Sequence, residues 1–237
     1  MSADESADLT RSPESLATER SRAYQIFCTA IAYPEDDLRE AIRAGTLSDA
    51  LRTVLTVVDE SLVEDVDWAA LCDAGADEDD LAVEFSRLFD VGSSGPPCPL
   101  YGGLYAGARM KTMEEAVRFY NHFGLTLSDD PRELPDHLTT QLEFLHYLGF
   151  REAQALVGDD DPGPYQRAQR DFVARHPGRW VPKLRERVED QAPAPYFGQL
   201  VALLDRFLAS EMNRLSREVG APDLSTRSSA GLQRPSV

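Results

Sequence analysis

The chain has few cysteines, and their spacing excludes the usual structural roles of paired cysteines. Only three occur in 237 residues, Cys28, Cys72 and Cys98. They are odd in number, far apart and never arranged as Cys-x-x-Cys, so neither a disulfide framework nor a zinc ribbon is indicated. Reduced thiols with a structural role are the interpretation that this spacing favours.

Long apolar runs are also missing. No stretch approaches the roughly 20 apolar residues that a helix needs to cross a membrane. The N-terminal residues, rich in Asp, Glu and Ser, lack the basic and then apolar order of a signal peptide. The sequence therefore predicts a cytoplasmic protein without an integral membrane segment.

Positive charge is scarce. Lys and Arg together number 24 against 41 Asp and Glu, which gives a formal net charge of -17, and Lys111 and Lys183 are the only lysines. Nucleic-acid binding draws its affinity from clustered Lys and Arg, so the composition argues against that class of partner. The charge balance favours basic partners instead.

The same acidity fits a protein that works in high salt, because repulsion between carboxylates is screened within about 3 Å at 1 M salt. We expect the melting temperature to rise when a low-salt buffer is replaced by molar KCl. A thermal melt followed by circular dichroism measures this effect. A melting temperature that does not rise would remove the hypothesis of a salt-loving source.

Signatures of covalent or nucleotide-dependent catalysis are absent as well. The chain has no Gly-x-Ser-x-Gly elbow, no phosphate loop ending in Gly-Lys-Ser/Thr and no dinucleotide fingerprint after a strand. Cys98 lies in a proline-rich segment that His137 could approach as a thiolate partner, but a small apolar anchor between prolines is the favoured interpretation. We therefore expect no enzyme activity and no catalytic residues.

One metal-ligand spacing is present. Glu143-x-x-His146 has the spacing of carboxylate-bridged di-iron bundles, but that motif must occur twice, and no other histidine follows a glutamate by three residues. A single zinc held by these two residues with Asp136 and His137 would need side chains that converge, whereas their positions spread around a helix. No resident metal is expected, and a helical metal-dependent enzyme centred on Glu143 and His146 is the alternative function.

Apolar residues recur at the three- and four-residue spacing that is typical of helices, and no alternating pattern typical of strands competes with it. The expected fold is all-α, a single-domain bundle of about eight to ten helices over residues 13–220. A disordered acidic N-terminus (1–12) and a flexible C-terminal tail (221–237) flank it. Expected helices include residues 36–44, 47–59, 135–158, 164–174, 180–189 and 195–219.

The stretch 91–107 interrupts the helical pattern. Its Gly and Pro residues are dense enough to exclude a regular helix, yet it carries large apolar and aromatic side chains. A loop of this composition is unusual and offers rigid contact area for a partner at low entropic cost. The side chains concerned are Leu100, Tyr101, Leu104 and Tyr105.

The most informative segment is Glu133-Leu-Pro-Asp-His-Leu with the helix that follows it. Pro135 suits the first turn of a helix, and Asp136 would place negative charge at the positive end of the helix dipole. The helix is therefore expected to begin near Pro135, with His137 and Glu143 on faces that flank its apolar stripe. That stripe consists of Leu138, Leu142, Leu145 and Leu148.

This segment resembles the Glu-x-Pro-Asp-His signature of the cytoplasmic chaperones for molybdenum oxidoreductases, the dimethyl-sulfoxide, trimethylamine-N-oxide and nitrate reductase assembly proteins. Leu142-Glu143-Phe144 continues the same element. Upstream, Glu84-Phe85-Ser86-Arg87-Leu88-Phe89 and the proline-rich loop resemble two further pieces of the family, and His176-Pro177-x-x-Trp180 resembles the start of its closing helices. The resemblance spans about residues 21–211. Many relatives carry Glu-Ser where Gly102-Gly103 stand, so a role for that acidic side chain does not transfer.

The resemblance implies an assembly chaperone for the catalytic subunit of a molybdopterin-dependent oxidoreductase of the dimethyl-sulfoxide reductase family. Such a chaperone assists cofactor insertion and delays export until the subunit is folded. Partner subunits in this family carry an N-terminal twin-arginine leader and then an apolar stretch, which match carboxylates and an apolar trough. The residues assigned to partner binding are Tyr101, Leu104, Tyr105, Glu133, Pro135, Asp136, His137 and Glu143.

The residues alone leave several points open. Asp136 also suits the first turn of a helix and His137 could fix the preceding loop, so both could be structural. A generic acidic adaptor for basic segments fits the net charge by itself. No cofactor is expected beyond transient contact with the molybdopterin cofactor or a guanine nucleotide, which only the resemblance implies. Both a monomer and a helix-exchanged dimer are compatible with the family resemblance.

Overall fold

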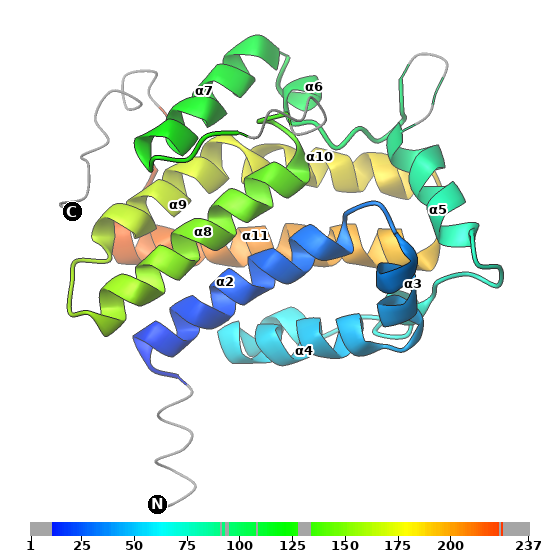
Figure 1. Cartoon of the computed structure of the whole chain (residues 1–237), viewed down its shortest axis with the longest axis horizontal. Helices are drawn as coiled ribbons and strands as arrows, with labels where there is room; N and C mark the ends of the chain where they lie inside the picture. The colour runs from blue at the N-terminus through cyan, green and yellow to red at the C-terminus, as the bar shows by residue number, and fades with distance from the viewer. Residues whose placement is uncertain are drawn as a thin grey trace, which may run out of the picture.

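The computed structural model describes residues 11–90, 92, 95–107, 109–127, 134–222 and 224, which form one all-helical domain (Figure 1). The expected single-domain bundle of eight to ten helices is confirmed. No helix in these ranges is long and apolar enough to span a bilayer. The α-helices are α2 (Pro13–Ala30), α3 (Asp36–Arg43), α4 (Thr46–Val58), α5 (Asp80–Phe85), α6 (Gly103–Ala106), α7 (Arg109–His122), α8 (Leu138–Val157), α9 (Gly163–Arg175), α10 (Pro177–Asp190) and α11 (Pro195–Val219). Shorter turns are η1 (Glu60–Val63), η2 (Ala70–Cys72) and the π-type turn η3 (Ser86–Asp90).

Helix α11 runs along the length of the bundle and lies behind α2 and α8 in the view of Figure 1. It has 25 residues, begins with Pro195 at its first position, and packs against α9 and α10. Its bounds confirm the helix expected over residues 195–219. Apolar side chains at three- and four-residue spacing face the core, as the pattern predicted. The largest are Phe197, Leu200, Leu204, Phe207, Leu208 and Leu215, all buried.

Helices α2 and α8 lie side by side (Figure 1). Gly149 of α8 permits the close approach, since a Cβ atom there would lie 3.2 Å from the Cα atom of Ser21. The Ser21 hydroxyl donates to the carbonyl of His146 at 2.8 Å. A ring of α2, Phe27, stacks on Phe207 with centroids 5.3 Å apart and so links this pair to α11.

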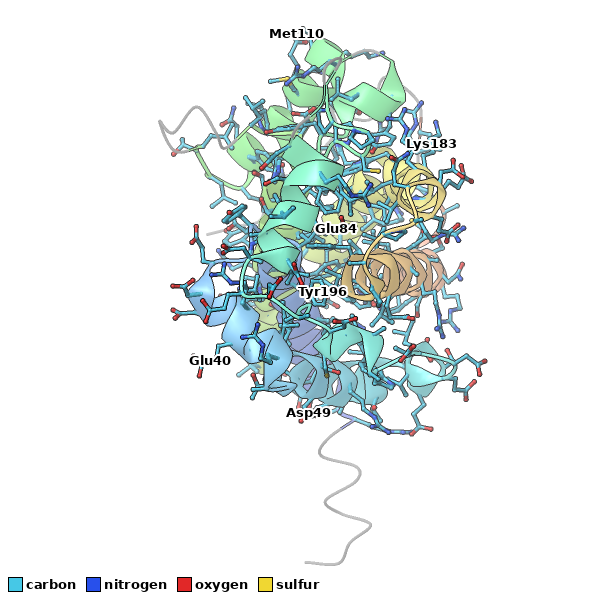
Figure 2. The ribbon with its side chains drawn as sticks, turned by 90° about the vertical axis from the view of Figure 1, so that its right-hand side faces the viewer. Glu40, Asp49, Glu84, Met110, Lys183 and Tyr196 are labelled. Carbon is cyan, nitrogen blue, oxygen red and sulfur yellow. The ribbon has the colours of Figure 1, made fainter. Side chains whose placement is uncertain are left out.

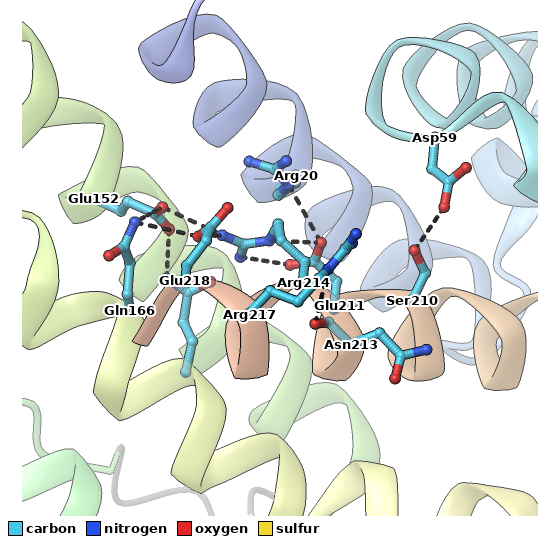
Figure 3. A network of polar contacts seen from close by, with 11 residues as sticks. Arg20, Asp59, Glu152, Gln166, Ser210, Glu211, Asn213, Arg214, Arg217 and Glu218 are labelled. Atoms are coloured by element: carbon cyan, nitrogen blue, oxygen red, sulfur yellow. Dashed lines mark hydrogen bonds and ion pairs between the residues drawn. The ribbon is translucent and has the colours of Figure 1, made fainter. Parts of the chain in front are cut away.

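A buried network of charges joins α2, α8 and α11 (Figure 3). Arg214 pairs with Glu211 at 2.9 Å, with Glu152 at 3.5 Å and with Glu218 at 2.7 Å. Arg20 of α2 reaches Glu211 at 3.3 Å. Burial would lower the pKa of Arg214, but the surrounding carboxylates raise it above its ordinary value. The guanidinium therefore stays charged inside the bundle.

Two expected helix starts and the expectation for one loop are wrong. Helix α8 begins at Leu138 instead of near Pro135, because residues 135 and 136 form a turn that precedes it. Helix α10 begins at Pro177 instead of Trp180, since proline occupies its first position without losing a helical hydrogen bond. The stretch 91–107 contains the one-turn helix α6, although no helix was expected there.

Several predictions lie wholly or partly outside the described residues. Glu133 is one of them, so its assignment to partner binding stays a prediction. The segments expected to be a disordered N-terminus (1–12) and a flexible tail (221–237) also fall mostly outside the described ranges. The domain boundaries at residues 13 and 220 likewise stay predictions.

Candidate functional site

The start of α8 is a capped turn built by residues 134–137. The amide of His137 donates to the carbonyl of Leu134 at 3.0 Å. His137 then acts as the N-cap residue, and its Nδ1 atom accepts from the amide of Thr139 at 3.3 Å. A cap of this kind satisfies a helical N–H group that has no partner within the helix. Tyr120 of α7 fixes the turn further, because its hydroxyl donates to the carbonyl of Pro135 at 2.7 Å.

The capping contact sets the tautomer of His137, and burial keeps the ring neutral. Because Nδ1 accepts a hydrogen bond, the proton of the neutral ring lies on Nε2. Burial lowers the pKa of His137 to about 4, so the ring is neutral at ordinary pH. The Oγ1 atom of Thr139 lies 2.6 Å from Nδ1 and completes the contact. His137 therefore contributes a neutral N–H group to the site and no positive charge.

The proline-rich loop is attached to this turn by backbone hydrogen bonds. The amide of Leu138 donates to the carbonyl of Leu100 at 2.9 Å, and the amide of Gly102 donates to the carbonyl of Asp136 at 2.8 Å. The bonds make an isolated antiparallel bridge between Tyr101 and His137, whose rings meet edge to face at 4.9 Å. We call these paired segments, residues 100–103 and 136–138, the loop–helix junction.

The carboxylate of Asp136 is enclosed within the loop–helix junction. Its side chain has no solvent exposure, and Oδ2 accepts from the amide of Gly103 at 3.0 Å. A Cβ atom on Gly103 would lie 2.8 Å from that oxygen, so glycine is needed for the approach. Burial raises the pKa of Asp136, while the Gly103 amide and the charge of Arg109 oppose the rise. Among the described residues, Oδ1 has no hydrogen-bond partner.

A second chain of hydrogen bonds connects the junction to α10. The indole Nε1 of Trp180 donates to Oε1 of Gln141 at 3.0 Å, and the amide group of Gln141 donates to the carbonyl of Asp136 at 3.3 Å. Trp180 also stacks on Tyr105, with ring centroids 5.2 Å apart. Gln141 and Trp180 were not among the residues assigned to the site. The His-Pro-x-x-Trp motif was the available signal for Trp180, whereas Gln141 gave none.

A groove of about 260 Å³ opens beside the first half of α8. Its walls combine apolar side chains with one exposed carboxylate, that of Glu143. The apolar residues come from the end of α7, from the segment after it and from α8. An extended peptide with apolar and basic side chains would be complementary to such a surface. The lining residues are Tyr120, Leu125, Thr126, Leu127, Thr140, Glu143, Phe144 and Tyr147.

The residues assigned to partner binding divide into two groups. Pro135, Asp136 and Tyr105 are buried, so they shape the site from within. On the outside, the side chain of Leu104 is 45% exposed, Tyr101 and His137 are partly exposed, and Glu143 is exposed. The loop–helix junction brings Tyr101, Asp136 and His137 together, whereas Glu143 lines the groove.

The geometry does not favour a metal site around Glu143 and His146. His146 faces α2, where its Nδ1 atom lies 2.8 Å from the Ser21 hydroxyl, while Glu143 is on the exposed side of α8. His146 is engaged by Ser21 of α2, through both its hydroxyl and its carbonyl, so its Nδ1 atom is not available to ligate an ion together with Glu143. In the part of the chain that the structure describes, no three His, Cys, Asp or Glu side chains are grouped for metal binding.

The cysteines have the environment of structural thiols. Burial raises the pKa of Cys98 to about 11 and that of Cys28 to about 12. Both are therefore protonated at neutral pH and are poor nucleophiles. Cys98 is fully buried, and its amide donates to the carbonyl of Leu88 at 2.9 Å, which ties the proline-rich loop to η3.

These features define the class of the protein as an all-helical domain, with a hydrogen-bonded junction beside an open groove. The family model described as nitrate reductase delta subunit matches residues 35–186. The chain belongs to this family, which confirms the resemblance to assembly chaperones of molybdenum oxidoreductases.

Curated relatives are similar over most of their length. The chain is 30% identical to the perchlorate reductase assembly chaperone protein of Dechloromonas aromatica, over 92% of this chain and 98% of the relative. It is 36% identical to the selenate reductase assembly chaperone protein of Thauera selenatis, over 70% and 88%. A crystal structure described as a redox enzyme maturation protein of Archaeoglobus fulgidus covers 83% of this chain and 93% of its own, at 19% identity and a TM-score of 0.44.

Proposed function

We propose that this protein is a cytoplasmic, non-enzymatic chaperone for the catalytic subunit of a molybdopterin-dependent oxidoreductase. It holds the subunit until the cofactor is inserted and, for an exported subunit, covers the leader until folding is complete. The observation that carries the proposal is the convergence of family motifs. Segments from the proline-rich loop, the Asp136-His137 turn and the His176–Trp180 motif meet in one hydrogen-bonded junction.

The groove beside α8 is the proposed binding site for the leader. Its apolar walls would cover the apolar stretch, and Glu143 would accept charge-assisted hydrogen bonds from an arginine. Arg109 lies over the ring of Tyr101, with its Cζ atom 5.7 Å from the ring centroid. Like charges repel, so Arg109 directs the leader arginines toward Glu143 and away from α6. Tyr101 and Leu104 would then contact the residues that follow the apolar stretch.

Within this proposal, Asp136 and His137 act mainly by holding the shape of the site. The Asp136 carboxylate is buried and already accepts a hydrogen bond from the backbone amide of Gly103. It therefore cannot also form a bidentate pair with an arginine of the leader unless the junction opens. His137, neutral and engaged through Nδ1, is suited to donate one hydrogen bond to a peptide carbonyl. The contribution of both residues is therefore preorganisation, which lowers the entropic cost of binding.

We expect Asp136→Ala combined with His137→Ala to weaken partner binding by more than about 1 kcal/mol and to leave helicity intact, because hydrogen bonds that order the junction are lost. Asp136→Asn is the matched control, since its amide oxygen can still accept from the Gly103 amide. Calorimetric titration with a leader peptide measures both. If Asp136→Asn weakened binding as much as the alanine variant, the negative charge itself would be needed. Equal loss of fold and binding would indicate a purely structural role.

The class of client is tested by purifying the tagged protein from its native host, grown on an alternative electron acceptor. Mass spectrometry of the co-purifying proteins should identify the catalytic subunit of a molybdopterin oxidoreductase. A groove-lining charge variant, Glu143→Lys, should recover much less of it, while Glu114→Lys on the exposed side of α7 should not. Recovery of no such subunit, together with stoichiometric iron or zinc, would favour the metal-dependent alternative.

A further inference from the structure

Positive charge gathers on one face of this acidic protein. Both lysines of the chain lie there, although 41 carboxylates outnumber the 24 Lys and Arg residues overall. Figure 2 shows Met110 and Lys183 toward the same end of the molecule. All five cationic side chains of this face are exposed. We call the set the basic patch: Arg109 and Lys111 of α7, and Arg179, Lys183 and Arg187 of α10.

Helix α6 holds the two halves of the basic patch together, because it contacts both α7 and α10. Arg109 lies over the ring of Tyr101, and the Cζ atom of Arg187 lies 4.4 Å from the ring centroid of Tyr105. Tyr105 in turn stacks on the buried Trp180. An arginine held on an aromatic face is preorganised, so less rotamer entropy is lost when it binds an acid.

The cations of α10 share one side of the helix. Arg179, Lys183 and Arg187 recur every four residues, a spacing that places side chains one above another. Neighbouring like charges at this spacing repel each other. Arg109 and Lys111 lie in the first turn of α7, which contains no acidic residue and where the helix dipole is positive. Both placements cost stability in the isolated protein and would be compensated by a negatively charged partner.

Within the described ranges, the cations of the basic patch form no ion pair, although the charge of Arg109 also acts on the buried Asp136. Nearby carboxylates pair elsewhere: Glu115 with Arg175 at 2.7 Å and Glu189 with Arg185 at 2.8 Å. Glu186 and Asp190 stand beside the patch on α10. Across the described ranges, no carboxylate lies within 4 Å of a charged nitrogen of its five cations. The cations that do form ion pairs in these ranges all lie outside the basic patch. They are Arg11, Arg20, Arg22, Arg39, Arg87, Arg118, Arg170, Arg175, Arg185 and Arg214.

Two exposed apolar side chains belong to the same face. Leu104 of α6 is 45% exposed and Met110 of α7 is 68% exposed. Met, Arg and aromatic residues are enriched at protein interfaces, where an apolar centre is surrounded by a charged rim. A phosphate or a nucleic acid would use the charges without needing this apolar centre. The composition therefore favours a protein partner.

We propose that the basic patch docks an acidic surface of the client's folded catalytic subunit, at a place separate from the leader groove. This inference rests on the proposed chaperone function. Arg109 is the first residue of α7, and Tyr120, which lines the groove, is near the end of the same helix. At a rise of roughly 1.5 Å per residue, the two lie about 16 Å apart along the helix axis. One client can therefore occupy both places, which raises the affinity through the effective concentration of the second contact.

The test uses the full-length catalytic subunit identified by co-purification and a synthetic peptide of its leader. Arg179→Glu combined with Lys183→Glu reverses two exposed charges of the basic patch. Arg43→Glu combined with Arg167→Glu changes the formal net charge by the same amount at exposed positions on α3 and α9. Circular dichroism establishes that each variant is folded. Biolayer interferometry at several salt concentrations then gives the dissociation constants.

We expect the patch variant to bind the full-length subunit at least tenfold more weakly at low salt, with a smaller dependence on salt. Its affinity for the leader peptide should stay within twofold of the wild type. The control variant should show neither loss. Equal binding of the full-length subunit by the patch and control variants would overturn the inference. So would a calorimetric site for inorganic pyrophosphate that the patch variant loses while its client affinity is unchanged.

Failure of the proposed function has a different signature. If the wild-type protein bound the full-length subunit but not the leader peptide, leader capture would be wrong, and the two charge variants would still decide the role of the patch. If the wild type bound neither probe, the chaperone assignment would fail, and the patch inference would fail with it.

Discussion

Replacing Arg214 by Met should lower the free energy of unfolding by about 3–5 kcal/mol, the usual loss when one partner of a buried ion pair is removed. Its side chain lies between Glu211 and Glu152, whose own side chains are 1% and 2% exposed. Without Arg214, two carboxylates would remain in the bundle core with only Arg20 near Glu211. Gln169 donates to Glu152 at 2.7 Å but brings no charge. The desolvation of these carboxylates is then uncompensated.

Urea unfolding at pH 7 measures this loss, and Arg217→Met is the matched control. Arg217 is three residues along the same helix but exposed, and its Nε atom donates to the carbonyl of Asn213 (Figure 3). We expect the control to change the unfolding free energy by less than about 0.5 kcal/mol. The loss for Arg214→Met should shrink at acid pH, because a protonated carboxyl group costs less to bury than an unpaired carboxylate. Equal stability of the two variants would contradict this account.

Protonation of His176 should destabilise the fold strongly below about pH 6.5. The ring is fully buried, and burial lowers its pKa from the ordinary value of 6.5 to about 3. It lies between Phe119 and Phe172, with centroids 5.8 Å and 4.5 Å away. Among the described residues, neither ring nitrogen has a hydrogen-bond partner. An imidazolium ion in this surrounding would have no compensating contact.

The direction of the pH effect follows from proton linkage. Below pH 6.5 the unfolded chain binds a proton at His176 that the folded chain does not, so the folded state loses stability as the pH falls toward 3. At about 1.4 kcal/mol per pKa unit, the shift corresponds to roughly 5 kcal/mol. His137, with a pKa of about 4, adds a smaller effect of the same sign.

Comparison of the wild type with His176→Phe isolates the His176 effect from the carboxylates that also titrate in acid. The variant keeps an aromatic ring in the pocket and removes two unpaired ring nitrogens, so its stability at pH 7.5 should be equal or higher. The difference in unfolding free energy between variant and wild type should widen as the pH falls from 6.5. Parallel stability curves from pH 7.5 to 4 would show that the folded protein accepts the His176 proton at no cost.

Local periodicity was sufficient to predict much of the fold. The bounds of α11 followed from its apolar spacing together with Pro195, and the end of α8 was placed near Gly158, one residue beyond Val157. The start of α8 was wrong because proline chemistry fits two positions, the first helical turn and the turn before the cap. Only the contact of the His137 side chain with the Thr139 amide distinguishes them.

The candidate site was harder to predict because its key contacts are between residues distant in sequence. The sequence around Asp136 is typical of an exposed acidic residue at the start of a helix. Nothing near it in sequence shows that Gly103 will enclose it. The partner of that carboxylate lies 33 residues away. Gln141 and Trp180 are separated by 39 residues and meet only after α8 and α10 have packed. The sequence motifs located the region of the site, whereas the division of its residues into enclosed and exposed ones required the three-dimensional contacts.

The loop–helix junction has a consequence for how this region fluctuates. The amides of Gly102, Gly103 and Leu138 all donate across the same pair of segments. None of these bonds can open far without moving the backbone that carries the others. The three amides should therefore exchange with solvent deuterium at a common slow rate, as one cooperative unit. A bound client would slow that exchange by stabilising a local equilibrium, so the state of the site can be followed through backbone hydrogens that the client never touches.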